Sequence, residues 1–184
     1  MRKIVAVVGD YRIEKDSLKY KMAFGMGKAL VDNGYRVQSG GKGGVMEAAF
    51  EGAHASKKYR DGDTIAILPS FDRTQVNPYA DIVIPTGIDL MRNTIVANAD
   101  AVIAIGGGAG TLSEMAMAWS LLRLVIAFSN VYGWSANLAG QKIDLRERYE
   151  NVDDKVFSVT APEQAIEYLN KYIDIYVKYH QGIK

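Results

Sequence analysis

The chain has 184 residues, of which 48% are hydrophobic and 23% charged, a composition ordinary for a soluble globular protein and sufficient for one domain with a substantial core. Its formal net charge of +1 gives no electrostatic argument for a nucleic-acid or membrane partner. There is no cysteine, which excludes disulfides and thiolate metal sites, and two isolated histidines, His54 and His180, give no basis for a metal site.

The N-terminus begins with Arg2 and Lys3, followed by the apolar run Ile4–Val8. This run is too short for a signal peptide, and no small-residue cleavage pattern follows it, so a first strand is the better interpretation. No segment approaches the length of a membrane span. We therefore expect a cytoplasmic protein in which residues 1–184 form a single domain.

Apolar runs, glycines and helical spacing alternate along the rest of the chain. The pattern predicts a helix over 15–33, a strand over 35–38, a glycine loop over 39–44, a helix over 45–56, a strand over 64–68 and a loop over 70–79. It then predicts a strand over 82–84, a short helix over 91–97, a strand over 101–105, a second glycine loop, a helix over 111–122 and a strand over 125–128. The polar segment 129–155 has no clear pattern. A last strand is expected over 156–159, and a final helix through Tyr176 is expected to start with Thr160 as N-cap and Glu163 as capping-box acid.

Strands separated by helices predict an α/β fold, with a doubly wound, mainly parallel sheet and helices on both faces. In such sheets ligands bind at the carboxyl ends of the strands, near the switch in strand order. Both glycine loops follow strands, so both are expected at that edge. This indicates a small-molecule ligand that is a nucleotide or another phosphorylated compound, and no separate cofactor.

The second glycine loop, within Ala101-Val-Ile-Ala-Ile-Gly-Gly-Gly-Ala-Gly-Thr-Leu-Ser-Glu114, is the most informative feature. Thr111 is a good N-cap, and Glu114 stands where a capping box places its acid. Free N–H groups and a positive helix end then meet at one point, which is typical of a phosphate site. The expected phosphate contacts are Gly107, Gly108, Gly110 and Thr111.

The first glycine loop, Ser39-Gly-Gly-Lys-Gly-Gly44, lacks the Gly-Lys-Ser/Thr of a Walker A loop, and the dinucleotide fingerprint would need glycine where Thr111 stands. A nicotinamide-type oxidoreductase is therefore disfavoured. Further ligand contacts are expected at Gly9, Gly40, Gly41, Lys42 and Gly44. Asp10 and Tyr11 follow the first strand and either touch a ribose or base or form a turn.

Ser39-Gly-Gly-Lys-Gly-Gly-Val-Met46 and Gly106-Gly-Gly-Ala-Gly-Thr-Leu-Ser-Glu114 resemble the paired motifs of the Lonely guy family. Its members are cytokinin-activating phosphoribohydrolases, formerly taken for lysine decarboxylases. The segment 77–87 and Arg92-Asn93 resemble most closely a subgroup of uncharacterised Rossmann-like nucleotide-binding proteins that includes molybdenum-cofactor carriers. The resemblance implies a Rossmann-like domain. Gly106 stands where the family has proline, and Asn93 where it usually has lysine.

The resemblance also implies that Arg92 and Glu114 break the N-glycosidic bond of a nucleoside 5′-monophosphate. A carboxylate can stabilise the positive charge that grows on the ribose, and Arg92 can orient it or bind ligand oxygens. The alternative function is a non-catalytic carrier, for example of the molybdenum cofactor. Structural alternatives remain open for these residues: Glu114 as a capping acid only, Arg92 paired with Asp89, and Lys42 solvated.

The predicted helix over 111–122 is apolar almost all round, which one sheet-facing stripe cannot bury. A second subunit can supply the missing cover, as the resemblance also implies, so we expect a homo-oligomer, a dimer or larger. The competing explanation is that the chain's own segment 129–155 covers this helix.

Overall fold

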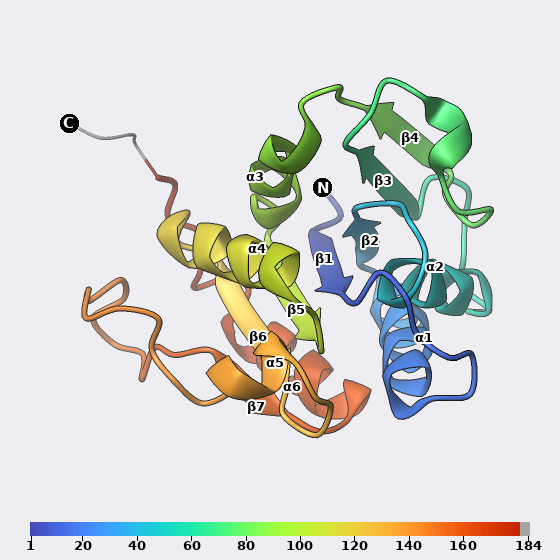
Figure 1. Ribbon diagram of the computed structural model, residues 1–184. Coiled ribbons are helices and arrows are strands. Elements are labelled where there is room, and N and C mark those ends of the chain that lie inside the picture. Colours follow the sequence, from blue (N-terminus) through green and yellow to red (C-terminus); the bar gives the residue numbers. More distant parts are fainter. Residues whose placement is uncertain (181–184) are drawn as a thin grey trace.

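A computed structural model describes residues 1–180 as a seven-stranded sheet between two layers of helices (Figure 1). The strands are β1 Ile4–Gly9, β2 Arg36–Ser39, β3 Thr64–Leu68, β4 Ile82–Pro85, β5 Ala101–Ile105, β6 Leu124–Phe128 and β7 Phe157–Val159. The α-helices are α1 Leu18–Asp32, α2 Val45–His54, α3 Asn93–Ala97, α4 Ala109–Ser120, α5 Trp134–Leu138 and α6 Pro162–Tyr172. Two short 3-10 helices, η1 Arg73–Gln75 and η2 Asp89–Arg92, come before and after β4 in the chain.

All neighbouring strands are parallel, and their order is β4-β3-β2-β1-β5-β6-β7. The chain builds outward from β1 to β4, returns to the other side of β1 and then builds outward to β7. The switch therefore lies between β1 and β5, where Gly9 is in register with Ile105. This confirms the predicted doubly wound, Rossmann-like α/β fold, and it brings the loops after β1 and β5 together.

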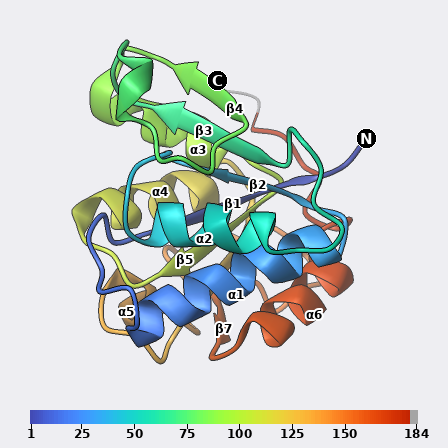
Figure 2. The ribbon, with the colours of Figure 1, turned by 90° about the vertical axis from the view of Figure 1, so that its right-hand side faces the viewer.

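The two faces of the sheet bury alternate residues, as the two-residue period of a strand requires. Val5 and Val7 pack with α1, α2 and α6, whereas Ala6 and Val8 pack with α3 and α4. Figure 2 shows α1, α2 and α6 side by side on their face of the sheet. None of the helices in residues 1–180 is long and apolar enough to cross a membrane.

Two glycines allow α1 and α2 to touch backbone to backbone. A Cβ on Gly27 would lie 1.8 Å from the Ala49 carbonyl oxygen, and one on Gly52 would lie 1.9 Å from that of Phe24. No side chain fits at such distances, so these positions require glycine for close packing. This close packing holds α2, and with it the end of the first glycine loop, against the rest of the domain.

The helix after the second glycine loop begins earlier than predicted. Its first residue is Ala109 and its N-cap is Gly108, which makes no side-chain capping bond. Thr111 is therefore a buried first-turn residue and Glu114 belongs to the second turn, so the predicted Thr111–Glu114 capping box is wrong. Gly110 belongs to the first turn of the helix, and Glu114 is buried.

The last helix also differs from its prediction at both ends. Its N-cap is Ala161 and not Thr160, and the side chain that accepts from the Thr160 N–H is Gln164 Oε1, at 2.7 Å, rather than Glu163. The helix ends at Tyr172. Tyr176 lies beyond it, but the chain folds back and buries this ring.

The segment 129–155, left unassigned above, contains α5 and otherwise irregular chain. Its buried centre is Arg148, whose Nε and Nη2 each lie 2.8 Å from a carboxylate oxygen of Asp154. The guanidinium lies 3.4 Å from the centre of the Trp119 ring of α4, and Tyr176 donates to Asp154 at 2.5 Å. The chain's own segment 129–155 thus covers Trp119. For this part of α4, the apolar surface is buried without a second subunit. Leu112 and Met117, on the same helix, remain half-buried.

We predict that Asp154→Ala lowers the free energy of unfolding by about 3–5 kcal/mol, because Arg148 would be left buried without its counter-charge. The matched control is Asp153→Ala. The Asp153 side chain is 79% exposed and, within residues 1–180, pairs only with Lys155, so its loss is expected to cost no more than about 0.5 kcal/mol. Urea unfolding measures both, and equal losses for the two variants would contradict the assigned role of Asp154.

Candidate functional site

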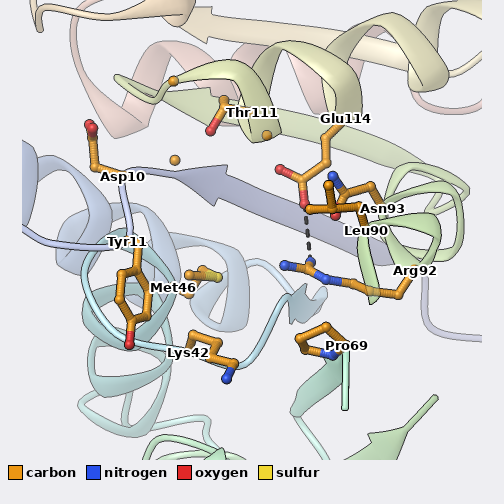
Figure 3. A pocket seen from close by; sticks show the side chains of 13 residues that line it. Asp10, Tyr11, Lys42, Met46, Pro69, Leu90, Arg92, Asn93, Thr111 and Glu114 are labelled. Atoms are coloured by element: carbon orange, nitrogen blue, oxygen red, sulfur yellow. Dashed lines mark hydrogen bonds and ion pairs between the residues drawn. The ribbon is translucent and has the colours of Figure 1, made fainter. Parts of the chain in front are cut away.

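A cavity of about 370 Å³ lies at the carboxyl ends of β1 and β5, at the switch point of the sheet (Figure 3). Its volume is in the range of small-molecule sites. It is lined by Gly9, Asp10, Tyr11, Lys42, Met46, Pro69, Leu90, Arg92, Asn93, Gly108, Gly110, Thr111 and Glu114. Seven of these positions were expected from the sequence as site residues: Gly9, Lys42, Arg92, Gly108, Gly110, Thr111 and Glu114.

The N–H groups of the second glycine loop fall into two sets. Gly106 donates to Ser135 Oγ at 2.7 Å and Gly107 donates to Asp10 Oδ2 at 2.8 Å, so the protein itself occupies the first two. The N–H groups of residues 108–111 have no acceptor within residues 1–180. Only this second set, at the start of α4, is free for an anion.

The free part of the loop also has open space beside it. A Cβ built on Gly108 or Gly110 would meet nothing within 4 Å, whereas one on Gly107 would lie 2.2 Å from Thr111 Oγ1. Gly107 has a φ of +90° and does not line the cavity. Its role in the structure is to make the turn, and Gly108 and Gly110 form the open wall.

Asp10 links the loops after β1 and β5. Besides accepting from Gly107, Asp10 Oδ2 lies 2.6 Å from Lys19 Nζ of α1. An acid beside the start of α4 is favoured by the helix dipole, and Lys19 balances its charge. The turn after β1 therefore holds the glycine loop in place and also contributes Asp10 and Tyr11 to the cavity wall.

Arg92, from η2, and Glu114, from α4, meet inside the cavity at 3.2 Å between Nη1 and Oε1 (Figure 3). Their side chains are 13% and 8% exposed, so this is a buried pair rather than a surface ion pair. Arg92 pairs with Glu114 and not with Asp89, one of the alternatives considered above. Glu114 does not act as a capping acid only, because its carboxylate contacts Arg92, which lies 22 residues earlier in the chain.

Gly40 makes room for Arg92. A Cβ at Gly40 would lie 2.4 Å from Arg92 Nη1, so the guanidinium lies directly on the backbone of the first glycine loop. Arg92 Nε and Asn93 Oδ1 are buried without a hydrogen-bond partner within the described chain. Unpartnered buried polar atoms beside a cavity are groups that a ligand or water can satisfy.

Burial dominates the protonation of this pair. It raises the pKa of Glu114 to about 7, partly offset by the nearby Arg92 charge, and it lowers the pKa of Arg92. A carboxyl group with a pKa near neutrality can exchange a proton at physiological pH, as general acids and bases do.

The remaining residues of the first glycine loop support the cavity from outside. Gly41, at a φ of +71°, would carry its Cβ 2.5 Å from that of Ala66, and Gly44, at +69°, would carry its own 2.2 Å from the Asp10 carbonyl oxygen. Neither these two nor Gly40 lines the cavity. Lys42 does line it, with its Nζ donating to Gln75 Oε1 at 2.5 Å.

Four lining residues were not expected from the sequence as site residues: the apolar Met46, Pro69 and Leu90 and the polar Asn93. Met46 and Asn93 stand inside the motif segments that carry the resemblance, and that position was the available signal. Pro69 and Leu90 follow other elements, and only the assembly of the sheet brings them to this cavity.

Comparisons with known proteins agree with this architecture. A model of the SLOG cluster4 family matches residues 2–166. An uncharacterized protein of Archaeoglobus fulgidus is 41% identical over 106 residues, which are 57% of this chain and 67% of that protein.

Two solved structures are similar over nearly their whole length. The structural-genomics target TM1055 has a TM-score of 0.78 at 28% identity, covering 92% of this chain and 99% of that one. The molybdenum cofactor binding protein from the phototrophic bacterium Rippkaea orientalis has a TM-score of 0.73 at 30% identity, covering 94% and 98%.

We predict that Glu114 makes stability fall as the pH rises. Its pKa is about 7 in the fold, above its ordinary value of 4.5, so between these values the folded chain holds a proton that the unfolded chain releases. The stabilisation is complete below pH 4.5 and is lost as the pH passes 7. Glu114→Gln, which stays neutral, is expected to remove a fall on the order of 1–3 kcal/mol between pH 5 and 8. Urea unfolding at both pH values tests this, and identical pH dependence in both proteins would contradict it.

Proposed function

This chain belongs to the SLOG cluster4 family, and from that membership and the geometry of the cavity we propose that it binds and carries a phosphorylated, nucleotide-like ligand of the molybdenum-cofactor type. The similarity to a molybdenum cofactor binding protein over 94% of the chain supports the choice of ligand class. It also agrees with the carrier alternative drawn from the sequence.

The observation that carries the proposal is the set of unpartnered N–H groups over residues 108–111, which opens onto a cavity of ligand size. They are suited to a terminal phosphate, and Lys42 adds a positive charge on the opposite wall. Met46, Pro69 and Leu90 supply apolar surface for the ring system of the ligand. The metal would arrive as part of the cargo.

We expect Gly110→Leu to abolish binding of guanosine 5′-monophosphate, a simple phosphorylated probe, and Gly110→Ala to weaken it less. The leucine side chain would project into the open space beside the phosphate-binding N–H groups, whereas both variants keep the helix, where glycine is the poorer residue. Isothermal titration calorimetry measures the binding. Unchanged affinity in Gly110→Leu would rule out a phosphate at the start of α4.

If the protein is a carrier, it is expected to hold its ligand when it is isolated from cells. Protein purified from a host that makes molybdenum cofactor is expected to release a fluorescent oxidised pterin on denaturation, in amounts that Gly110→Leu reduces. Equal release from both proteins would count against this cavity as the carrier site.

The buried Arg92–Glu114 pair favours a second candidate function, hydrolysis of a nucleoside 5′-monophosphate to free base and ribose 5-phosphate. When the N-glycosidic bond breaks, its electron pair leaves with the base and positive charge grows on the ribose. The oxygen of a water molecule then bonds to the sugar carbon, and one proton of that water ends on the base. Ionised Glu114 would stabilise that charge, and Arg92 would orient Glu114 or hold ligand oxygens.

If hydrolysis occurs, we expect Glu114→Gln to abolish turnover and leave nucleotide binding largely intact, because charge stabilisation acts mainly in the transition state. A panel of nucleoside 5′-monophosphates is incubated with the protein, and free base and ribose 5-phosphate are measured. If none of the nucleotides gives product, the carrier is the one proposed function that stands. Unchanged turnover in the variant would remove Glu114 from the mechanism.

We further propose a homo-oligomer, now on a different surface from the one expected at first. Several large apolar side chains outside the cavity are exposed on β4, η2, α3 and the turn between them: Ile82, Ile84, Ile88, Met91 and Ile95. An apolar group around an unpaired edge strand is typical of an interface. Light scattering is expected to give at least a dimer and Met91→Asp is expected to weaken it, whereas a 20.2 kDa monomer at micromolar concentration would contradict the proposal.

A further inference from the structure

A second cavity, of about 440 Å³, adjoins the candidate site. It is lined by Pro69, Ser70, Phe71, Gln75, Gly87 and Asp89. Pro69 is a wall of both cavities, and Lys42 of the first donates to Gln75 of the second. The two cavities are therefore neighbouring compartments along the carboxyl edge of the sheet.

Phe71 has the geometry of a stacking surface. Its side chain is 80% exposed, yet its ring lies against Gly87, where a Cβ would be 2.1 Å from the ring carbon Cζ. Gly87 also has a φ of +66°, so a side chain is excluded there for two reasons. One side of the ring is thus supported by the glycine backbone, while the other is open for a planar group.

Asp89 adds an acceptor beside this ring. Its φ of +50° is uncommon for a residue other than glycine, and its N–H is tied to the Pro69 carbonyl oxygen at 3.0 Å. Its carboxylate has no hydrogen-bond or ion-pair partner in residues 1–180. Strained residues held in place by their surroundings cluster at binding sites, which fits an acid presented to a ligand.

The spacing of the strands sets the length of ligand that reaches both ends. The start of α4 follows β5 and Phe71 follows β3, and these strands are three places apart in the sheet. At roughly 4.8 Å per strand the separation is about 14 Å. A mononucleotide with its phosphate at α4 fills the first cavity, and a longer molecule is needed to reach Phe71.

We propose that the second cavity is a subsite for the second ring of a dinucleotide-type ligand, stacked on Phe71 with its N–H groups donating to Asp89. This rests on the proposed phosphate site at α4. A carboxylate accepts two adjacent N–H donors, as on the N1–H and 2-amino edge of guanine. Adenine offers an amino group beside the ring nitrogen N1, and the lone pair of N1 would face a carboxylate oxygen unfavourably. The subsite therefore selects guanine-like rings.

Calorimetric titration compares guanosine 5′-monophosphate with the linear dinucleotide 5′-phosphoguanylyl-(3′→5′)-guanosine, in which the second guanosine lies beyond the first when the terminal phosphate is bound at α4. The dinucleotide is expected to bind about tenfold more tightly or better, the contribution typical of one stacked base. Phe71→Ala is expected to erase that advantage and leave the mononucleotide affinity unchanged. Leu145→Ala, which removes a 99% exposed apolar side chain elsewhere, is expected to alter neither.

Asp89→Asn tests the acceptor without disturbing the backbone, because asparagine also tolerates a positive φ. It is expected to reduce the preference for the linear dinucleotide with guanine as its second base over the one with adenine there, with mononucleotide binding retained. An unchanged preference would overturn the role of Asp89.

Failure of the subsite is distinguishable from failure of the proposed site. If the mononucleotide binds but the dinucleotide gains nothing, the subsite is wrong and the phosphate site stands. If neither binds, both are wrong. If Phe71→Ala changes the mass in light scattering but not the dinucleotide affinity, Phe71 belongs to a contact between copies of the chain, which also overturns the subsite.

Discussion

The division of the backbone N–H groups after β5 is the constraint on which the site depends. Gly106 and Gly107, both at positive φ, turn the chain at the switch between β1 and β5, where the N–H groups of residues 106–111 follow one another. Asp10 and Ser135 bind the first two, which anchors the loop to the turn after β1 and to α5. The N–H groups of residues 108–111 have no acceptor within residues 1–180 and lie at the positive end of α4. One half of the loop thus anchors the fold, and the other half is the one to which we assign the proposed ligand.

The Arg92–Glu114 pair follows from this arrangement. Because α4 starts at Ala109, Glu114 is carried into the buried second turn, where η2 places Arg92 opposite. Transfer out of water disfavours both charges, and their attraction offsets this only in part, so Glu114 titrates near neutrality. Gly40 allows the guanidinium to lie on the other glycine loop. One buried pair therefore joins two motifs that are far apart in the chain.

The segment 129–155 stabilises the site from behind. Ser135 donates to the Phe128 carbonyl oxygen and accepts from Gly106, so it connects the end of β6 to the glycine loop. Further along, Arg148 and Asp154 are bound to the carbonyl oxygen of Trp119 and to the hydroxyl of Tyr176. The chain after the last helix is thereby linked to the back of α4. This accounts for a polar segment that shows no periodicity: its side chains bond to other elements rather than form a face of their own.

Local patterns were enough to predict the order and type of the main elements, because apolar runs, helical spacing and glycines act over a few residues. They predicted β5, the glycine loop and a following helix, and they drew attention to Arg92 and Glu114, which meet in the cavity. Contacts between distant parts of the chain set the rest: the start of α4 at Ala109, the hydrogen bond from the Gly107 N–H to Asp10, the packing of Gly40 against Arg92, and the walls made by Pro69 and Leu90. A glycine allows many backbone conformations and identifies none, so only the groups that meet it in the folded chain determine whether it turns, packs or faces a ligand.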